Sequence, residues 1–249
     1  MGGDFLLLAA IGFFAQLVDG ALGMAFGVIS TSAMLTLGLP PAHASAITHT
    51  AGVFTSATSG ASHLYFRNVD WRLVLRLGVA GVLGAILGAW ALSNVDGEVA
   101  RPFVSAYLLV IGATILFKAF RRKPPEDRPF KLAPPLGLVG GFLTASGGGG
   151  WGPIVTSTLI GSGHAPRMVV GSVNTTEFFV AVAAATTFFV ELGAAPLYHL
   201  LALVTGGVLA APFGGWAVKH LPARYLMTLV GVVICLLAAW QLARFFRLI

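Results

Sequence analysis

Apolar segments long enough to cross a lipid bilayer recur along this chain and restrict it to a membrane fold. Leu73–Leu92 and Leu226–Phe246 are two of them, and each carries a single charged residue. About 20 such residues span the ~30 Å hydrocarbon core as a helix. Only 10% of the residues are charged and 57% are hydrophobic, whereas soluble domains carry about 25% charged residues. The sequence therefore predicts an all-α integral membrane protein with about eight hydrophobic segments, multi-pass in the cell (inner) membrane.

The formal net charge of +6 gathers mainly in one stretch, "KAFRRKPPEDRPFK", Lys118–Lys131. This composition is typical of a cytoplasmic loop that follows the positive-inside rule. A nucleic-acid partner would need a basic face on a soluble domain, and the sequence offers none. The single cysteine, Cys235, excludes internal disulfides and cysteine metal clusters. No catalytic set or metal-ligand spacing is present, so the sequence predicts a protein that is not an enzyme and has no cofactor.

The two halves of the chain resemble each other. "GVLGAILGAWA" (Gly81–Ala91) matches "GVLAAPFGGWA" (Gly207–Ala217) at seven of eleven positions, and "FGVISTS" (Phe26–Ser32) lies over "WGPIVTS" (Trp151–Ser157) at nearly the same offset. A common offset indicates an internal repeat. We therefore expect a first transmembrane repeat at 1–120, a basic cytoplasmic linker at 121–131 and a second transmembrane repeat at 132–249.

Each half opens with an interrupted apolar segment. The interruptions are "DGALGMAFG" (Asp19–Gly27) and "SGGGGWGP" (Ser146–Pro153). Such a segment either crosses the membrane once as a broken helix or returns as a re-entrant hairpin. The hairpin version leaves three full crossings per half and makes the repeats inverted, which is a recurrent plan of transporters. The sequence favours that version and leaves the other open.

Glycine-rich backbone in the membrane must be buried in protein or line a polar cavity. Its N–H groups can converge on an anion, and the helix that follows, expected from about Pro153, offers its positive dipole end. Close helix packing is the alternative role of these glycines. The predicted substrate-binding residues are Gly20, Gly23, His49, Thr50, Ser146, Gly147, Gly148, Gly149, Gly150, Trp151, Asn174 and Thr175. The predicted carriers of any coupled proton are Asp19, His49 and Glu177, because titratable groups inside a membrane are costly to bury.

Two stretches resemble the signatures of the sulfite exporter TauE/SafE family of membrane permeases. They are "AQLVDGALGMAFGVISTSAML" (Ala15–Leu35) and "GGFLTASGGGGWGPIVTSTLIGSGHAPRMVVGSVNTTEFF" (Gly140–Phe179). The resemblance implies a transporter of small sulfur oxyanions or organosulfonates, often an exporter. Relatives of this subtype commonly carry an acidic residue before the glycine run, where this chain has Thr144.

The expected function is secondary transport of sulfite or an organosulfonate by alternating access, with the anion held at the midplane between the two interruptions. The alternatives are an uncoupled anion channel or facilitator and a permease for small carboxylates such as lactate. An intramembrane enzyme that uses His49 and Glu177 as acid and base is a further, weaker alternative. The partners expected are the small anionic substrate and the lipid bilayer, with no nucleic acid, and the sequence leaves a homo-oligomer open.

Overall fold

The computed structural model describes residues 2–120, 132–162, 164–213 and 223–247, so the predicted linker at 121–131 lies outside the described residues. The described residues form helices and turns and contain no strand. In chain order the helices are α1 (Gly2–Leu22), α2 (Phe26–Thr36), α3 (Pro41–Tyr65), α4 (Trp71–Ser93), α5 (Gly97–Ala119), α6 (Ala133–Gly147), η1 (Trp151–Thr156), α7 (Ser157–Gly161), α8 (Pro166–Leu192), α9 (Leu197–Ala210), η2 (Ala211–Phe213) and α11 (Ala223–Phe245). The expected all-α class is therefore confirmed.

Five helices in the described ranges are long and apolar enough to cross a membrane: Phe5–Leu22, Trp71–Ser93, Gly97–Ala119, Arg167–Leu192 and Arg224–Phe245. Phe26–Thr36 and Leu197–Phe213 are shorter apolar helices. Large apolar side chains such as Leu83, Phe103 and Leu236 are more than half exposed on the outside of the bundle. A surface of this kind is stable against lipid, because lipid tails are as apolar as these side chains. The protein is therefore a multi-pass membrane protein.

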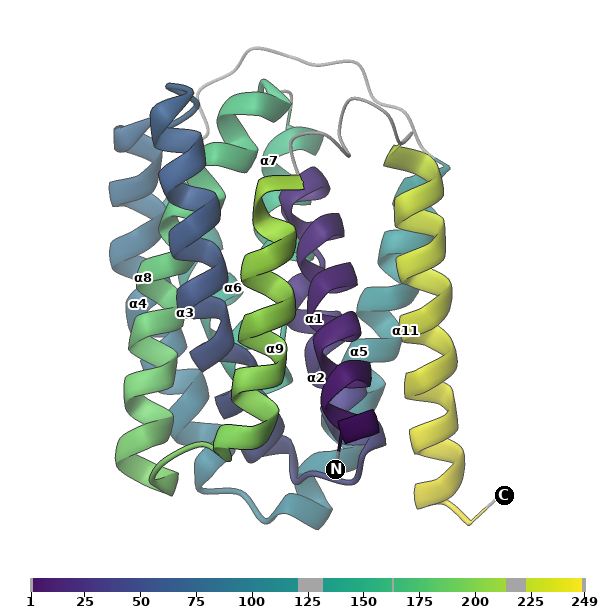
Figure 1. Ribbon diagram of the computed structural model, residues 1–249. Coiled ribbons are helices and arrows are strands. Elements are labelled where there is room, and N and C mark those ends of the chain that lie inside the picture. The colour runs from purple at the N-terminus through teal and green to yellow at the C-terminus, as the bar shows by residue number, and fades with distance from the viewer. Residues whose placement is uncertain (1, 121–131, 163, 214–222, 248–249) are drawn as a thin grey trace.

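Helices from before the linker pack against helices from after it (Figure 1). The most extensive pairs are α4 with α6, α1 with α9, α3 with α8 and α5 with α11. Glycines allow the close approach, since a Cβ on Gly88 would lie 3.0 Å from the carbonyl carbon of Phe142 on α6 and one on Gly206 would lie 2.8 Å from the backbone nitrogen of Phe13 on α1. Small residues at helix contacts are the usual means of dense packing in a membrane.

The first interrupted segment turns back on itself. The N-terminus lies at the lower end of the bundle in Figure 1, and α1 rises from there. The turn after α2 lies at the same end, because Arg101 at the start of α5 donates hydrogen bonds of 3.2 and 3.1 Å to the carbonyl oxygens of Gly38 and Leu39. The chain therefore reverses at Gly23–Ala25, and the segment is a re-entrant hairpin.

The second interrupted segment reverses in the opposite sense. Helix α6 runs down beside α4, with Gly137 against Leu77 near its start and Phe142 against Gly88 further on. After the reversal, α7 leads back to the upper end, where Arg167 at the start of α8 donates to the carbonyl oxygen of Phe66 at 3.0 Å. Of the two topologies left open by the sequence, the structure has the hairpin for both segments.

Candidate functional site

The second interruption is made of glycines that no other residue replaces easily. Gly148, Gly149 and Gly150 have φ values of 74°, 152° and 154°, which L-residues rarely adopt. Gly147 ends α6, and a wide π-helical turn begins directly at Trp151 rather than near Pro153 as expected. Such turns are frequent at functional sites. The first interruption is equally long, from Gly23 to Ala25, and within it Gly23 has φ of 66°.

The two interruptions lie against each other. A Cβ on Gly27 would lie 3.0 Å from the Cα of Gly149. The Thr156 hydroxyl donates to the carbonyl oxygen of Gly23 at 2.9 Å, and the Thr31 hydroxyl donates to that of Gly148. These contacts place early residues of one segment opposite late residues of the other. The helices that follow the interruptions therefore run antiparallel with their N-termini side by side.

Asp19 caps the helix that follows the first interruption. Its Oδ1 atom accepts hydrogen bonds from the backbone N–H groups of Ala25 at 2.7 Å and Phe26 at 3.2 Å, and its side chain is 5% exposed. A carboxylate at this position satisfies orphan donors and interacts favourably with the helix dipole. Asp19 thus holds the turn in place, whatever part it has in proton transfer.

Replacing Asp19 with alanine is expected to destabilise the protein by about 1–2 kcal/mol, because two buried N–H groups lose their acceptor. The measurement is the thermal unfolding midpoint in detergent. Asp70 is the matched control, since it caps α4 in the same way, at 2.9 Å from the Arg72 nitrogen, but at an exposed site where water can replace it. A loss for Asp19→Ala no greater than that for Asp70→Ala would contradict the buried-cap account.

A small cavity of about 20 Å³ lies beside the two interruptions. That volume holds roughly one water molecule. Its polar lining residues are Thr48, His49, Thr144 and Glu177, and its aromatic ones are Phe26 and Trp151. The cavity is too small for a polyatomic anion in this conformation, so binding one requires the lining helices to move apart.

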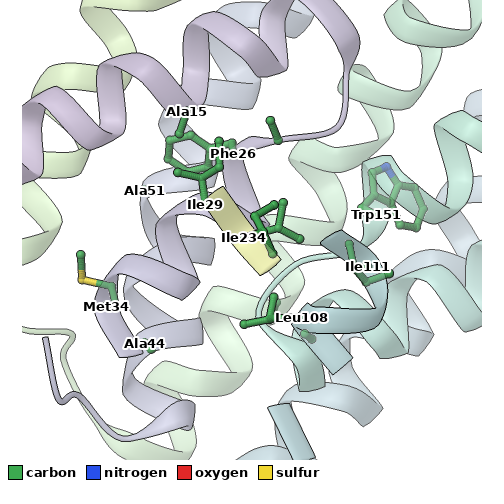
Figure 2. Packing of buried hydrophobic residues seen from close by; sticks show 14 of the residues in the cluster. Ala15, Phe26, Ile29, Met34, Ala44, Ala51, Leu108, Ile111, Trp151 and Ile234 are labelled. Atoms are coloured by element: carbon green, nitrogen blue, oxygen red, sulfur yellow. The ribbon is translucent and has the colours of Figure 1, made fainter. Parts of the chain in front are cut away.

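Phe26 and Trp151 occupy corresponding places, each as the first residue of the helix after an interruption. A Cβ on Gly207 would lie 3.4 Å from the Phe26 ring, and one on Gly81 would lie 2.7 Å from the Trp151 ring. Figure 2 shows both rings among the buried hydrophobic side chains. The two repeated stretches, Gly81–Ala91 and Gly207–Ala217, therefore begin at the glycines next to which these rings lie.

His49 lines the cavity, and one of its ring nitrogens faces its own helix. Its Nδ1 lies 2.9 Å from the carbonyl oxygen of Ser45, which can only accept a hydrogen bond. Nδ1 must therefore carry the proton in the neutral ring, which leaves Nε2 as an acceptor. When the ring is protonated, Nε2 becomes a donor with positive charge.

Glu177 lines the cavity from α8. Thr144 stands before the glycine run and also lines the cavity, so a neutral hydroxyl occupies the position where the resemblance places an acid. The cavity thus combines one carboxyl group, one imidazole and neutral hydroxyls.

The remaining predicted residues lie outside the cavity lining. The Thr50 and Thr175 hydroxyls bond to Ala46 and Gly171 of their own helices at 2.7 and 2.8 Å, and Ser146 bonds to Phe142 at 2.7 Å. Gly20 lies within α1, before the turn. Ser146 and Gly147 line a separate apolar groove of about 410 Å³ between α4, α5 and α6. Asn174 is fully buried next to His63.

Sequence reasoning missed Thr48 and Phe26 as wall residues, and it also missed Asn68, which contacts His63 and Arg167. The internal repeat pairs Phe26 with Trp151, so that signal was available for Phe26. Within the described ranges no group of three or more His, Cys, Asp or Glu side chains could hold a metal ion.

Re-entrant hairpins that meet at a buried polar cavity inside a multi-pass helical bundle are features of membrane transporters. The family model described as "Sulfite exporter TauE/SafE" matches residues 8–240, and the chain belongs to this family. It is also 43% identical over 243 residues to the "Probable membrane transporter protein YtnM" of Bacillus subtilis (strain 168), covering 94% of this chain and 81% of that protein. No solved structure is significantly similar. The protein is therefore a membrane transporter.

Proposed function

We propose that this transporter moves small sulfur-containing anions such as sulfite or organosulfonates across the cell inner membrane, as an exporter coupled to protons. The observation that carries the proposal is the meeting of two helix N-termini, at Phe26 and Trp151, beside the polar cavity. Asp19 already accepts hydrogen bonds from the N–H groups of Ala25 and Phe26. The anion would therefore be stabilised by the positive dipole ends of the two helices and by the glycine-rich backbone at Gly148–Gly150, without a lysine or arginine. The family description supports the substrate class.

The proton coupling follows from the charges that line the cavity. An anion beside an ionised Glu177 would be repelled, and an anion beside neutral His49 would face an acceptor nitrogen. Both obstacles are removed when each group takes up a proton. Anion binding and protonation therefore favour each other, and the anion and its proton would cross in the same direction. Export would then be driven by the outward gradient of the anion, because an inward proton gradient opposes it.

The helix pairing supports two inverted repeats, 1–120 and 132–249, that rock against each other. The contact of α1 with α9 corresponds in the repeat to the contact of α6 with α4, while α3 pairs with its counterpart α8 and α5 with α11. An inverted arrangement exposes a central site alternately to the two sides. Because the cavity holds only about one water, such a movement must open it before the anion enters.

The charge distribution supports a cytoplasmic upper end. Arg67 and Arg72 lie at the turn between α3 and α4, close to Arg167, whereas Arg101 lies at the lower end with the start of α1 and the end of α11. Cytoplasmic ends of membrane proteins carry the excess of Lys and Arg. The predicted basic linker follows α5, which ends at the upper end in Figure 1.

Ligand-dependent stability of the purified protein tests the substrate class. A ligand at about 100 times its Kd stabilises a protein by roughly 2.7 kcal/mol, which raises the unfolding midpoint by several degrees. We expect sulfite or sulfoacetate to raise the midpoint and lactate to have little effect, because a sulfur oxyanion offers three oxygens to the site and a carboxylate two. A rise with lactate alone would contradict the proposed substrate class and favour a carboxylate permease.

A further inference from the structure

A chain of polar side chains leads from the upper end of the bundle toward the cavity. Exposed Arg167 donates from Nε to the Oδ1 atom of Asn68, whose side chain is 9% exposed. The Asn68 amide nitrogen lies 3.5 Å from Nδ1 of His63, and Nε2 of His63 lies 3.5 Å from the atom placed as the amide nitrogen of Asn174. Asn174 is 0% exposed, and the atom placed as its amide oxygen has no partner among the described residues.

In this series of side chains, Arg167 at the outer end decides which atoms donate and which accept hydrogen bonds. Arginine can only donate, so Asn68 must turn its carbonyl oxygen to Arg167 and its NH₂ group to His63. Nδ1 of His63 then accepts, and the proton of the neutral ring resides on Nε2. Because Nε2–H donates, it requires the carbonyl oxygen of Asn174 as its acceptor. The Asn174 amide is therefore turned by 180° relative to the placement given above, which leaves its shape unchanged, because hydrogen-bond partners decide the orientation of an amide.

The consequence is that the NH₂ group of Asn174 points to the position that has no protein partner. Buried donors are nearly always paired, and an unpaired one in a native structure calls for an explanation. Asn174 lies one helical turn from Glu177, which lines the cavity, and the Trp151 indole donates to the carbonyl oxygen of the adjacent Val173 at 3.3 Å. The free donor therefore lies between the cavity and the upper end.

We propose that Arg167, Asn68 and His63 are positioning residues that orient Asn174 so that its NH₂ group binds an oxygen of the transported anion on the upper-end side of the cavity. This inference rests on the proposed transport of an oxyanion. It assigns Asn174 the role of a donor and gives three side chains outside the cavity a function in substrate recognition.

Close packing holds Asn68 in place against α8. A Cβ on Gly171 would lie 2.9 Å from the Cβ of Asn68, so the turn after α3 presses directly against α8. The Ser172 hydroxyl accepts a hydrogen bond of 2.8 Å from the backbone N–H of Asp70. Asn68 is thus held against α8 at both sides, which fixes the start of the chain of hydrogen bonds.

Two substitutions of His63 test the positioning role in proteoliposomes with labelled sulfite. His63→Phe keeps a planar ring but cannot relay a hydrogen bond, whereas the amide of His63→Gln can accept from Asn68 and donate to Asn174. We expect His63→Phe to raise KM for sulfite at least tenfold with a maximal rate within about twofold of wild type, and His63→Gln to stay within about threefold in both. A purely structural role would let the phenylalanine ring substitute at least as well as glutamine.

Asn174→Leu provides a second test, because it removes a buried amide at similar size and should fold well. It is expected to raise KM for sulfite at least tenfold. Unchanged KM in Asn174→Leu, or equal KM values for His63→Phe and His63→Gln, would overturn the inference. Absence of saturable sulfite and sulfoacetate flux in the wild-type protein would instead overturn the proposed function, so the two failures are distinguishable.

Discussion

Replacing Gly149 with alanine is expected to reduce transport to the level of protein-free liposomes. A Cβ at this position would lie 2.5 Å from the backbone nitrogen of Val28 and 2.6 Å from the carbonyl carbon of Gly27. Both atoms belong to the backbone of the opposite hairpin and cannot move away as a side chain could. The two interruptions would have to separate, which disperses the N–H groups that we propose bind the anion.

The control for Gly149→Ala is Gly38→Ala. Gly38 also has a positive φ, of 90°, but a Cβ there would meet nothing within 4 Å. The strain of an alanine at this positive φ, about 1–2 kcal/mol, should lower the stability of the protein without lowering flux. Size-exclusion profiles in detergent verify that both variants are folded and inserted. Wild-type flux in Gly149→Ala would exclude the contact of the two interruptions from the transport site.

Replacing Glu177 with glutamine is expected to separate anion movement from the proton gradient. Glutamine resembles the protonated carboxyl group at every pH, so the anion no longer needs to bring a proton to this position. Sulfite should still cross, and its stimulation by a proton gradient should fall at least fivefold. The measurement is initial flux into proteoliposomes with and without the gradient.

Glu191→Gln is the matched control, since Glu191 is exposed at the lower end of α8, within 3.4 Å of the Asn94 amide, and away from the cavity. That variant should keep the full response to the gradient. If Glu177→Gln responds to the gradient as strongly as wild type, the coupled proton is carried by another group, and His49 is the next to be tested.

Much of the fold could be predicted because its main signals are local. Apolar length gives the membrane helices, and glycine runs give the interruptions, as at Gly148–Gly150. The internal repeat also suggested that both segments share one topology. The cap at Asp19 is less local, because Asp19 lies within α1 and accepts from the N–H groups of Ala25 and Phe26 across the turn.

The candidate site could be predicted only in part. Which residues line it depends on the helix face that each residue occupies and on how the helices cross. Ser146 adjoins the glycine run, yet its phase on α6 directs it to the apolar groove. Thr48 and Thr50 belong to the same polar stretch of α3, but only Thr48 lines the cavity. The polar composition of this stretch does not show which of its serine and threonine side chains face the cavity. The link from Asn68 to Asn174 depends on how α3 and α8 cross, which no local pattern specifies.

The most direct test of the account is the flux of labelled sulfite into proteoliposomes, measured against protein-free liposomes and with labelled sulfoacetate as a second anion. The account predicts saturable flux of at least one of these sulfur anions, accelerated when the proton gradient runs in the direction of the anion and lost in Gly149→Ala. Saturable flux that is indifferent to the gradient would contradict the coupling. The absence of saturable flux for both anions would contradict the central claim that this protein transports sulfur-containing anions.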